Sequence, residues 1–301
     1  MLNNLKEIEK GFRKISALSG KLMVLNEPEP VYKEINNNSE LFGLDAMLAS
    51  KIILKEIEFY RKIAKDLRKN FEPTISHQIS VTWLFSLLKN EDETGKLVAF
   101  CHDWIEDRRD FLIRGGEWAE AEKERLFLEL RMEFREYLRK LGLEDEEQEI
   151  VFENVLALTR NRKESYASYV QNIVKEGVDD SGRCIILIKL IDKLHNSCSF
   201  LDGELTMEER LLRDAVKCIY IIKKVKEAVE KIEEKESVNR LVELNRKKTF
   251  ENLGRIADGK GDALSCDAEK ILCSMLDKDK NWSSVPFSER ALLLKSILEN
   301  I

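Results

Sequence analysis

The chain has 301 residues, of which 43% are apolar, 35% are charged and only four are proline, and its formal net charge is −6. This length can bury a sizeable core without disulfides, and the acidic balance argues against broad nucleic-acid binding, which needs a basic face. The six cysteines include no Cys-x-x-Cys pair, and neither a signal peptide nor a membrane-length apolar run stands out, so we expect a cytoplasmic protein with reduced thiols and no membrane anchor.

Hydrophobic periodicity predicts that helices make up most of the chain. The first helix is expected over residues 1–25. The stretch 26–40 holds two of the four prolines and an Asn run, so we expect a loop or short linker there. Further helices are expected over residues 43–70, 76–89 and 94–107. The N-terminal third is therefore predicted to be a series of helices joined by short breaks.

The remainder of the chain is also predicted to be helical. The charged stretch 117–141 predicts one amphipathic helix that ends at Gly142, with its polar side either solvated or in contact with another copy in a homo-oligomer. Asp179, Asp180 or Ser181 is expected to cap an apolar helix that extends to Asn196. Other helices are expected over 145–158, 165–176 and 206–246, and again after Gly254. Neither strand alternation nor a repeat of 20–50 residues is found, so the fold class is predicted to be all-α.

The first candidate site surrounds a His-Asp pair. The protein has three histidines, and each lies on a predicted helix beside acidic or amide residues. On the helix predicted over 94–107, His102 and Glu106 are spaced i,i+4, and so are Asp103 and Asp107. Burying these polar groups alone would be costly, and a cation bound to the imidazole and the carboxylate would offset that cost.

A second polar group interrupts the apolar helix ending at Asn196. Lys189, Asp192 and Asn196 share one face, which is typical of the lining of a polar pocket. Asp192 could supply a further metal oxygen, and Lys189 and Asn196 could bind phosphate or orient other ligands. His77, near the start of the helix over 76–89, could supply the remaining nitrogen. Two histidines and two carboxylates suit Mn²⁺, Fe²⁺ or Zn²⁺ better than Ca²⁺.

Four ordered motifs resemble the HD phosphohydrolase superfamily. The resemblance is closest to the hydrolase domain of RelA/SpoT-type alarmone enzymes and to their small stand-alone relatives. The motifs are RKNFEPTISHQISV, AFCHDWIED, LTRNRKESYASYV and RCIILIKLIDKLHN, and the resemblance spans about residues 60–205. It implies an HD-domain helical bundle, with residues 1–40 as an N-terminal helix and loop, 41–235 as the HD domain and 236–301 as a C-terminal helical appendage.

The resemblance also implies roles for individual residues. The ligands of one divalent cation, usually Mn²⁺, would be His77, His102, Asp103 and Asp192. Glu106 and Asp107 would position water and handle protons. Substrate contacts would come from Arg68 near the nucleotide base, and from Lys189 and Asn196. The implied reaction removes a 3′-pyrophosphate from guanosine tetra- or pentaphosphate.

Several alternatives stay open on the sequence alone. The substrate could be another nucleotide or a nucleoside phosphate, or the site could bind a nucleotide without turning it over. Asp192 could instead form a buried ion pair with Lys189 or Arg183, and Glu106 and Asp107 could pair with neighbouring arginines on the surface. Arg160 and Tyr166 could line the substrate pocket, although Tyr166 could equally be a core residue.

Overall fold

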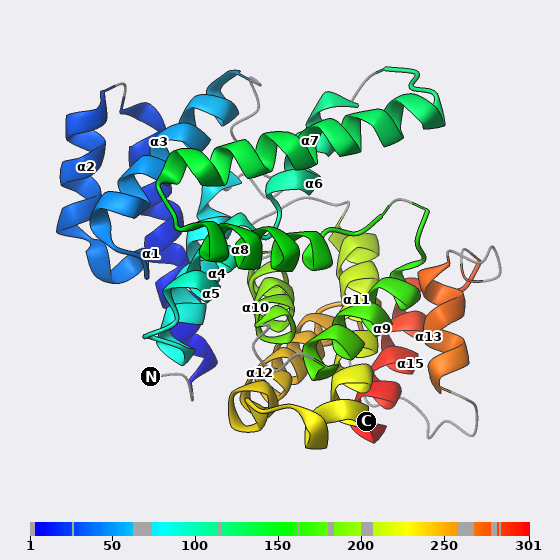
Figure 1. Cartoon of the computed structure of the whole chain (residues 1–301). Helices are drawn as coiled ribbons and strands as arrows, with labels where there is room; N and C mark the ends of the chain where they lie inside the picture. Colours follow the sequence, from blue (N-terminus) through cyan, green and yellow to red (C-terminus); the bar gives the residue numbers. More distant parts are fainter. Residues whose placement is uncertain are drawn as a thin grey trace. The chain divides into compact units, whose positions relative to one another are not determined.

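The computed structural model describes residues 4–25, 27–62, 74–113, 116–161, 163–179, 184–199, 207–257, 268–277, 282 and 284–301. Within these ranges every regular element is a helix, and none is a strand (Figure 1). The predicted all-α class is therefore confirmed, while the HD-type arrangement stays a prediction. Among the described helices, none combines the length and apolar character that crossing a membrane requires.

The chain forms two compact units, Met1–Arg160 and Asn161–Ile301. The division expected at residues 40 and 235 stays a prediction. The helices of the first unit are α1 (Leu5–Val24), α2 (Pro28–Asn37), η1 (Ser39–Leu41), α3 (Ala46–Lys62), α4 (Thr74–Leu88), α5 (Glu93–Cys101), α6 (Trp104–Leu112), α7 (Glu120–Leu141) and α8 (Asp145–Leu158).

Helix α4 is the central element of the first unit. Every residue from 75 to 86 is buried, because apart from His77 and Gln78 this stretch carries apolar or small side chains on all its faces. It packs against α1, α3 and α5. Gly11 on α1 permits a close approach, since a Cβ atom there would lie 2.1 Å from Cη2 of Trp83 on α4. His77 is thereby carried on a helix enclosed by its neighbours.

Two predictions about the first unit need correction. Residues 26–40 were expected to be a loop, but Pro28–Asn37 forms helix α2. Proline is compatible with the first turn of a helix, and Val31 and Ile35, one turn apart, are both buried. The single helix expected over 94–107 is in fact two helices, α5 and α6, which meet at His102 and Asp103.

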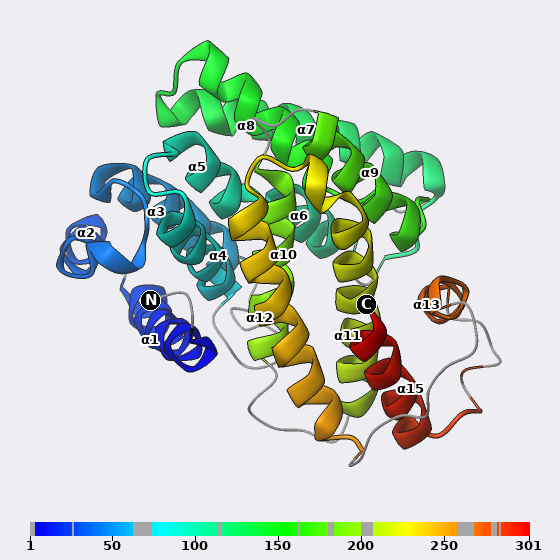
Figure 2. The ribbon, with the colours of Figure 1, turned by 90° about the horizontal axis from the view of Figure 1, so that it is seen from below.

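The helices of the second unit are α9 (Tyr166–Asp179), α10 (Ile185–Cys198), α11 (Met207–Ala228), η2 (Val229–Lys231), α12 (Lys235–Gly254), α13 (Ala268–Leu276) and α15 (Phe287–Asn300). Helix α10 is almost entirely buried and packs against α9, α11 and α12 (Figure 2). Helix α12 also bonds to the backbone of α10, because Asn245 Nδ2 donates to the Leu190 carbonyl at 2.9 Å and Asn252 Nδ2 donates to the Ser197 carbonyl at 2.8 Å. These bonds fix the helix that carries Asp192.

Two predictions about the second unit also differ from the structure. The helix expected over 206–246 is interrupted between α11 and α12, where Ile232 is extended and its side chain is buried. Asp179 ends α9 rather than capping α10, whose N-cap residue is Cys184. Asp180 and Ser181 lie outside the described residues.

Candidate metal centre

The junction between α5 and α6 places two of the predicted ligands. His102 caps the C-terminus of α5, and Asp103, with φ −102° and ψ 5°, leaves the helical path before α6 begins at Trp104. His102 and Glu106 are therefore not i,i+4 neighbours on one helix, as the sequence had suggested. The break lets the imidazole and the adjacent carboxylate both approach His77, which a continuous helix would not favour.

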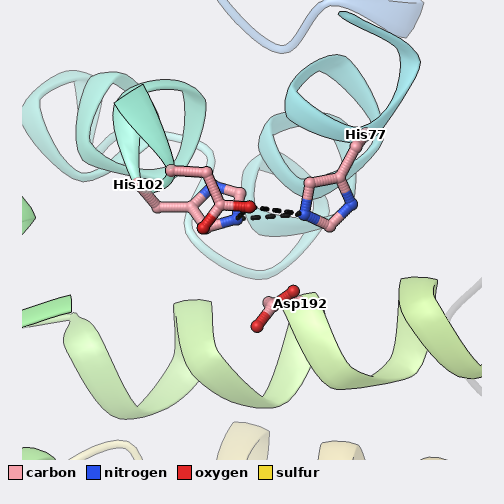
Figure 3. A group of neighbouring side chains, drawn as sticks. His77, His102 and Asp192 are labelled. Carbon is pink, nitrogen blue, oxygen red and sulfur yellow. Dashed lines mark hydrogen bonds and ion pairs between the residues drawn. The ribbon is translucent and has the colours of Figure 1, made fainter. Parts of the chain in front are cut away.

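Three donor atoms of the first unit lie close together. Nε2 of His77 is 3.1 Å from Nε2 of His102 (Figure 3). Oδ2 of Asp103 is 3.3 Å from the first of these nitrogens and 3.2 Å from the second. Both imidazoles are buried, while the Asp103 side chain keeps 23% of its exposure. The group is therefore accessible to solvent mainly at the Asp103 carboxylate.

The tautomer of His102 follows from its other nitrogen. Nδ1 lies 2.8 Å from the carbonyl oxygen of Ala99. A carbonyl can only accept a hydrogen bond, so Nδ1 carries the proton and Nε2 of the neutral ring carries a lone pair. A backbone bond of this kind is what orients a metal-binding histidine.

Asp192 on α10 is buried and sits among polar groups of its own helix. Its Oδ2 lies 2.9 Å from Nζ of Lys189 and 3.2 Å from Nζ of Lys193. Asn196 Nδ2 donates to Oδ1 at 2.5 Å. The alternative of an ion pair with Lys189 is thus realised, and Asn196 orients the carboxylate. Arg183 lies outside the described residues.

The ligand atoms of His77, His102, Asp103 and Asp192 all lie within 4.8 Å of one another, and Figure 3 shows the two imidazoles and the Asp192 carboxylate directed toward a common point. These are the four residues predicted as ligands. Two nitrogen and two oxygen donors fit a divalent cation of the Mn²⁺, Fe²⁺ or Zn²⁺ type. The neighbouring Cys101 is not part of this group, and burial raises the pKa of its thiol well above the usual value.

The predicted catalytic residues lie at the start of α6. Glu106 Oε1 accepts a hydrogen bond from the backbone amide of Arg160 at 2.6 Å, and Arg109 Nη1 donates to the Arg160 carbonyl at 2.9 Å. Arg160 is thus held by its backbone on α6. Arg108 and Arg109, the arginines considered from the sequence as surface partners of these acids, are both buried.

Comparisons with family models, with curated proteins and with solved structures give no match for this chain.

The remaining predicted substrate residue in the second unit is Tyr166. It is buried, and within the described part of the chain its hydroxyl has no hydrogen-bond partner. Burial also raises the pKa of its hydroxyl, which therefore stays protonated at neutral pH. The Tyr166 ring packs against the Tyr169 ring, with 6.1 Å between the two centroids. Arg68 lies outside the described residues.

One buried ion pair was not predicted from the sequence. Arg108 Nη2 donates to Glu56 Oε1 at 3.0 Å, and the Arg108 guanidinium lies 3.7 Å from the centroid of the Trp104 ring. Glu56 has no exposed surface. The signal was present, because Glu56 interrupts the apolar face formed by Ile52, Ile53 and Ile57. The pair links α3 to α6 one residue after the predicted catalytic acids.

Proposed function

We propose that this protein is a metal-dependent phosphohydrolase of the HD type that acts on a phosphorylated nucleotide. The single observation that carries the proposal is the grouping of His77, His102, Asp103 and Asp192, whose ligand atoms lie within 4.8 Å of one another. These four residues come from three separate stretches of the chain, and each stretch carries one of the motifs that resemble the HD superfamily.

The residues around the site support this chemistry. When bound, a divalent cation at such a site supplies Lewis-acid activation of water and of the phosphoryl group. His102 keeps its Nε2 lone pair available because Nδ1 is engaged by Ala99. One oxygen of Glu106 is engaged by the Arg160 amide, so we assign the orientation of water to Glu106 and the transfer of protons to Asp107.

The substrate is proposed from the motif resemblance together with the local charge. Lys189 and Lys193 place two ammonium groups beside Asp192, which suits a polyanionic substrate. Removal of a 3′-pyrophosphate from guanosine tetra- or pentaphosphate with Mn²⁺ is the specific reaction that we propose. Hydrolysis of another nucleotide is the first alternative within the same class.

Elemental analysis of the purified protein tests the metal site. We expect one equivalent of a transition metal in the wild type and in His195→Gln, and strong loss in His77→Gln and Asp103→Asn. His195 is a matched control because it is buried on α10, with Nδ1 at 3.2 Å from Ser199 Oγ, and is not part of the four-residue group. Equal metal content in all four proteins would reject the site.

A nucleotide panel with Mn²⁺ tests the reaction. We expect phosphate or pyrophosphate release by the wild type and a fall of about 10²–10⁴-fold in Asp107→Asn, with metal content unchanged. Turnover unaffected by both Asp107→Asn and Asp103→Asn would contradict the proposal.

A second candidate function is a nucleotide-binding module without turnover. The observation in its favour is the pairing of Asp192 with both Lys189 and Lys193, since ion pairing competes with metal ligation. Nucleotide binding without hydrolysis across the panel, lost in Lys189→Ala, would favour this function over the hydrolase.

A further inference from the structure

Three lysines gather on two adjacent helices of the second unit. Lys189 and Lys193 on α10 both reach Oδ2 of Asp192. Lys217 lies on α11, which packs against α10. Burial lowers the pKa of Lys217 to about 8, and the positive charge of Lys193 is the next largest cause. The positive charges of Lys193 and Lys189 therefore both act on the Lys217 ammonium group.

Lys217 is half-buried on α11. Within the described residues it forms no ion pair, although Asp214 on the same helix attracts its charge from a distance. Its Nζ instead lies 5.2 Å from the centroid of the Tyr166 ring. Lys189 has a matching position, 5.2 Å from the centroid of the Tyr169 ring.

Tyr166 adds an unused hydrogen-bond donor to this cluster. Its side chain is buried, and its hydroxyl has no partner within the described part of the chain. The Tyr166 ring lies 6.1 Å from the Tyr169 ring, centroid to centroid, and Lys189 lies over that second ring, so Tyr166 is part of the same cluster. A cation–π contact explains the ring beneath Lys217, but it leaves the buried hydroxyl unsatisfied at a free-energy cost.

We propose that Lys217 and Tyr166 bind a phosphate group of the substrate, beside the ammonium groups of Lys189 and Lys193. This inference rests on the proposed function, because it takes the phosphate to belong to the substrate of that reaction. A phosphate offers several acceptor oxygens and a double negative charge. It would therefore give the Tyr166 hydroxyl an acceptor and the Lys217 ammonium group a counter-charge.

Calorimetric titration with inorganic pyrophosphate tests the site on the full chain as purified, with no free metal added. We expect Lys217→Ala to weaken the dissociation constant about tenfold, as for loss of one charged hydrogen bond. Lys217→Arg should stay within about threefold of the wild type, because the charge is kept. Lys226→Ala on the last turn of α11 is the matched control and should leave the dissociation constant unchanged.

Tyr166→Phe separates a binding role from a packing role. We expect it to weaken pyrophosphate binding several-fold without loss of thermal stability, because the hydroxyl removed has no partner within the described residues. Equal dissociation constants for Lys217→Ala and Lys226→Ala, or no binding by the wild type at millimolar pyrophosphate, would overturn the inference.

The metal content of the same samples keeps the two proposals apart. A wild-type protein that contains no bound metal would reject the proposed function, whatever the pyrophosphate titration gives. A normal metal content with a Lys217→Ala variant that binds pyrophosphate like the wild type would reject only the phosphate site.

Discussion

Nε2 of His77 and Nε2 of His102 lie 3.1 Å apart, and Oδ2 of Asp103 lies within 3.3 Å of both. Since Nδ1 of His102 holds its proton toward Ala99, the Nε2 lone pair of His102 faces this carboxylate. A lone pair and a carboxylate repel each other, and a cation between them would remove that repulsion. The group could therefore hold a metal ion at this point.

The first prediction is that Mn²⁺ or Zn²⁺ stabilises the protein. At a free concentration of about 100 times the dissociation constant, the free energy of unfolding should rise by about 2.7 kcal/mol. Thermal unfolding followed by circular dichroism, with and without metal after dialysis against a chelator, measures the effect. Asp103→Asn should abolish most of it, while His195→Gln should keep it. A shift of equal size in Asp103→Asn would show that the cation binds elsewhere.

The second prediction concerns the ion pair between Glu56 and Arg108. Both side chains are buried, so Glu56→Gln removes the buried carboxylate charge that faces Arg108 and should lower the free energy of unfolding by about 3–5 kcal/mol. Urea denaturation gives this value. The comparison is Glu149→Gln, which breaks the half-exposed pair with Arg135 and should cost at most about 1 kcal/mol. Similar losses of unfolding free energy in the two variants would mean that burying the Glu56–Arg108 pair does not increase the cost of breaking it.

The third prediction is that Gly11→Ala disrupts the packing of α1 against α4. The added methyl would overlap the Trp83 ring, and we expect a loss of about 1–3 kcal/mol in the free energy of unfolding. Gly254→Ala is a suitable control because its Cβ would approach only Nζ of Lys295, at 3.9 Å, and alanine favours helices. Guanidinium denaturation of both variants checks the contrast, and an unchanged midpoint for Gly11→Ala would contradict it.

The fourth prediction uses the pKa of Lys217, which falls from its usual 10.5 to about 8 in the folded chain. Between these values the unfolded chain binds more protons, so the cost of burying this lysine is full below pH 8 and disappears as the pH rises toward 10.5. Lys217→Met should therefore stabilise the protein at pH 7 by roughly 1–3 kcal/mol, after allowing for partial exposure.

Urea denaturation of wild type and Lys217→Met at pH 7 and pH 10 measures this difference. The gap between the two proteins should shrink at the higher pH. A gap that is constant with pH would mean that the ammonium group carries no burial cost.

The sequence by itself determined the helical class and singled out His77, His102, Asp103 and Asp192, the four residues that the structure groups. Helical periodicity depends on side chains within about four positions of each other, so the apolar faces of α4 and α10 could be predicted locally. The spacing of Lys189, Asp192 and Asn196 also placed them together on one face, and the structure joins them by direct bonds.

Only the tertiary structure decided how the polar residues are used. The end of α5 at His102 and Asp103 carries no glycine or proline signal, so periodicity extended one helix across it. The bond from the Arg160 amide to Glu106 joins residues 54 positions apart, and the pair between Glu56 and Arg108 joins residues 52 positions apart. Such partners are chosen by the packing of whole helices, because a buried charge or donor bonds to whichever acceptor the fold brings within reach.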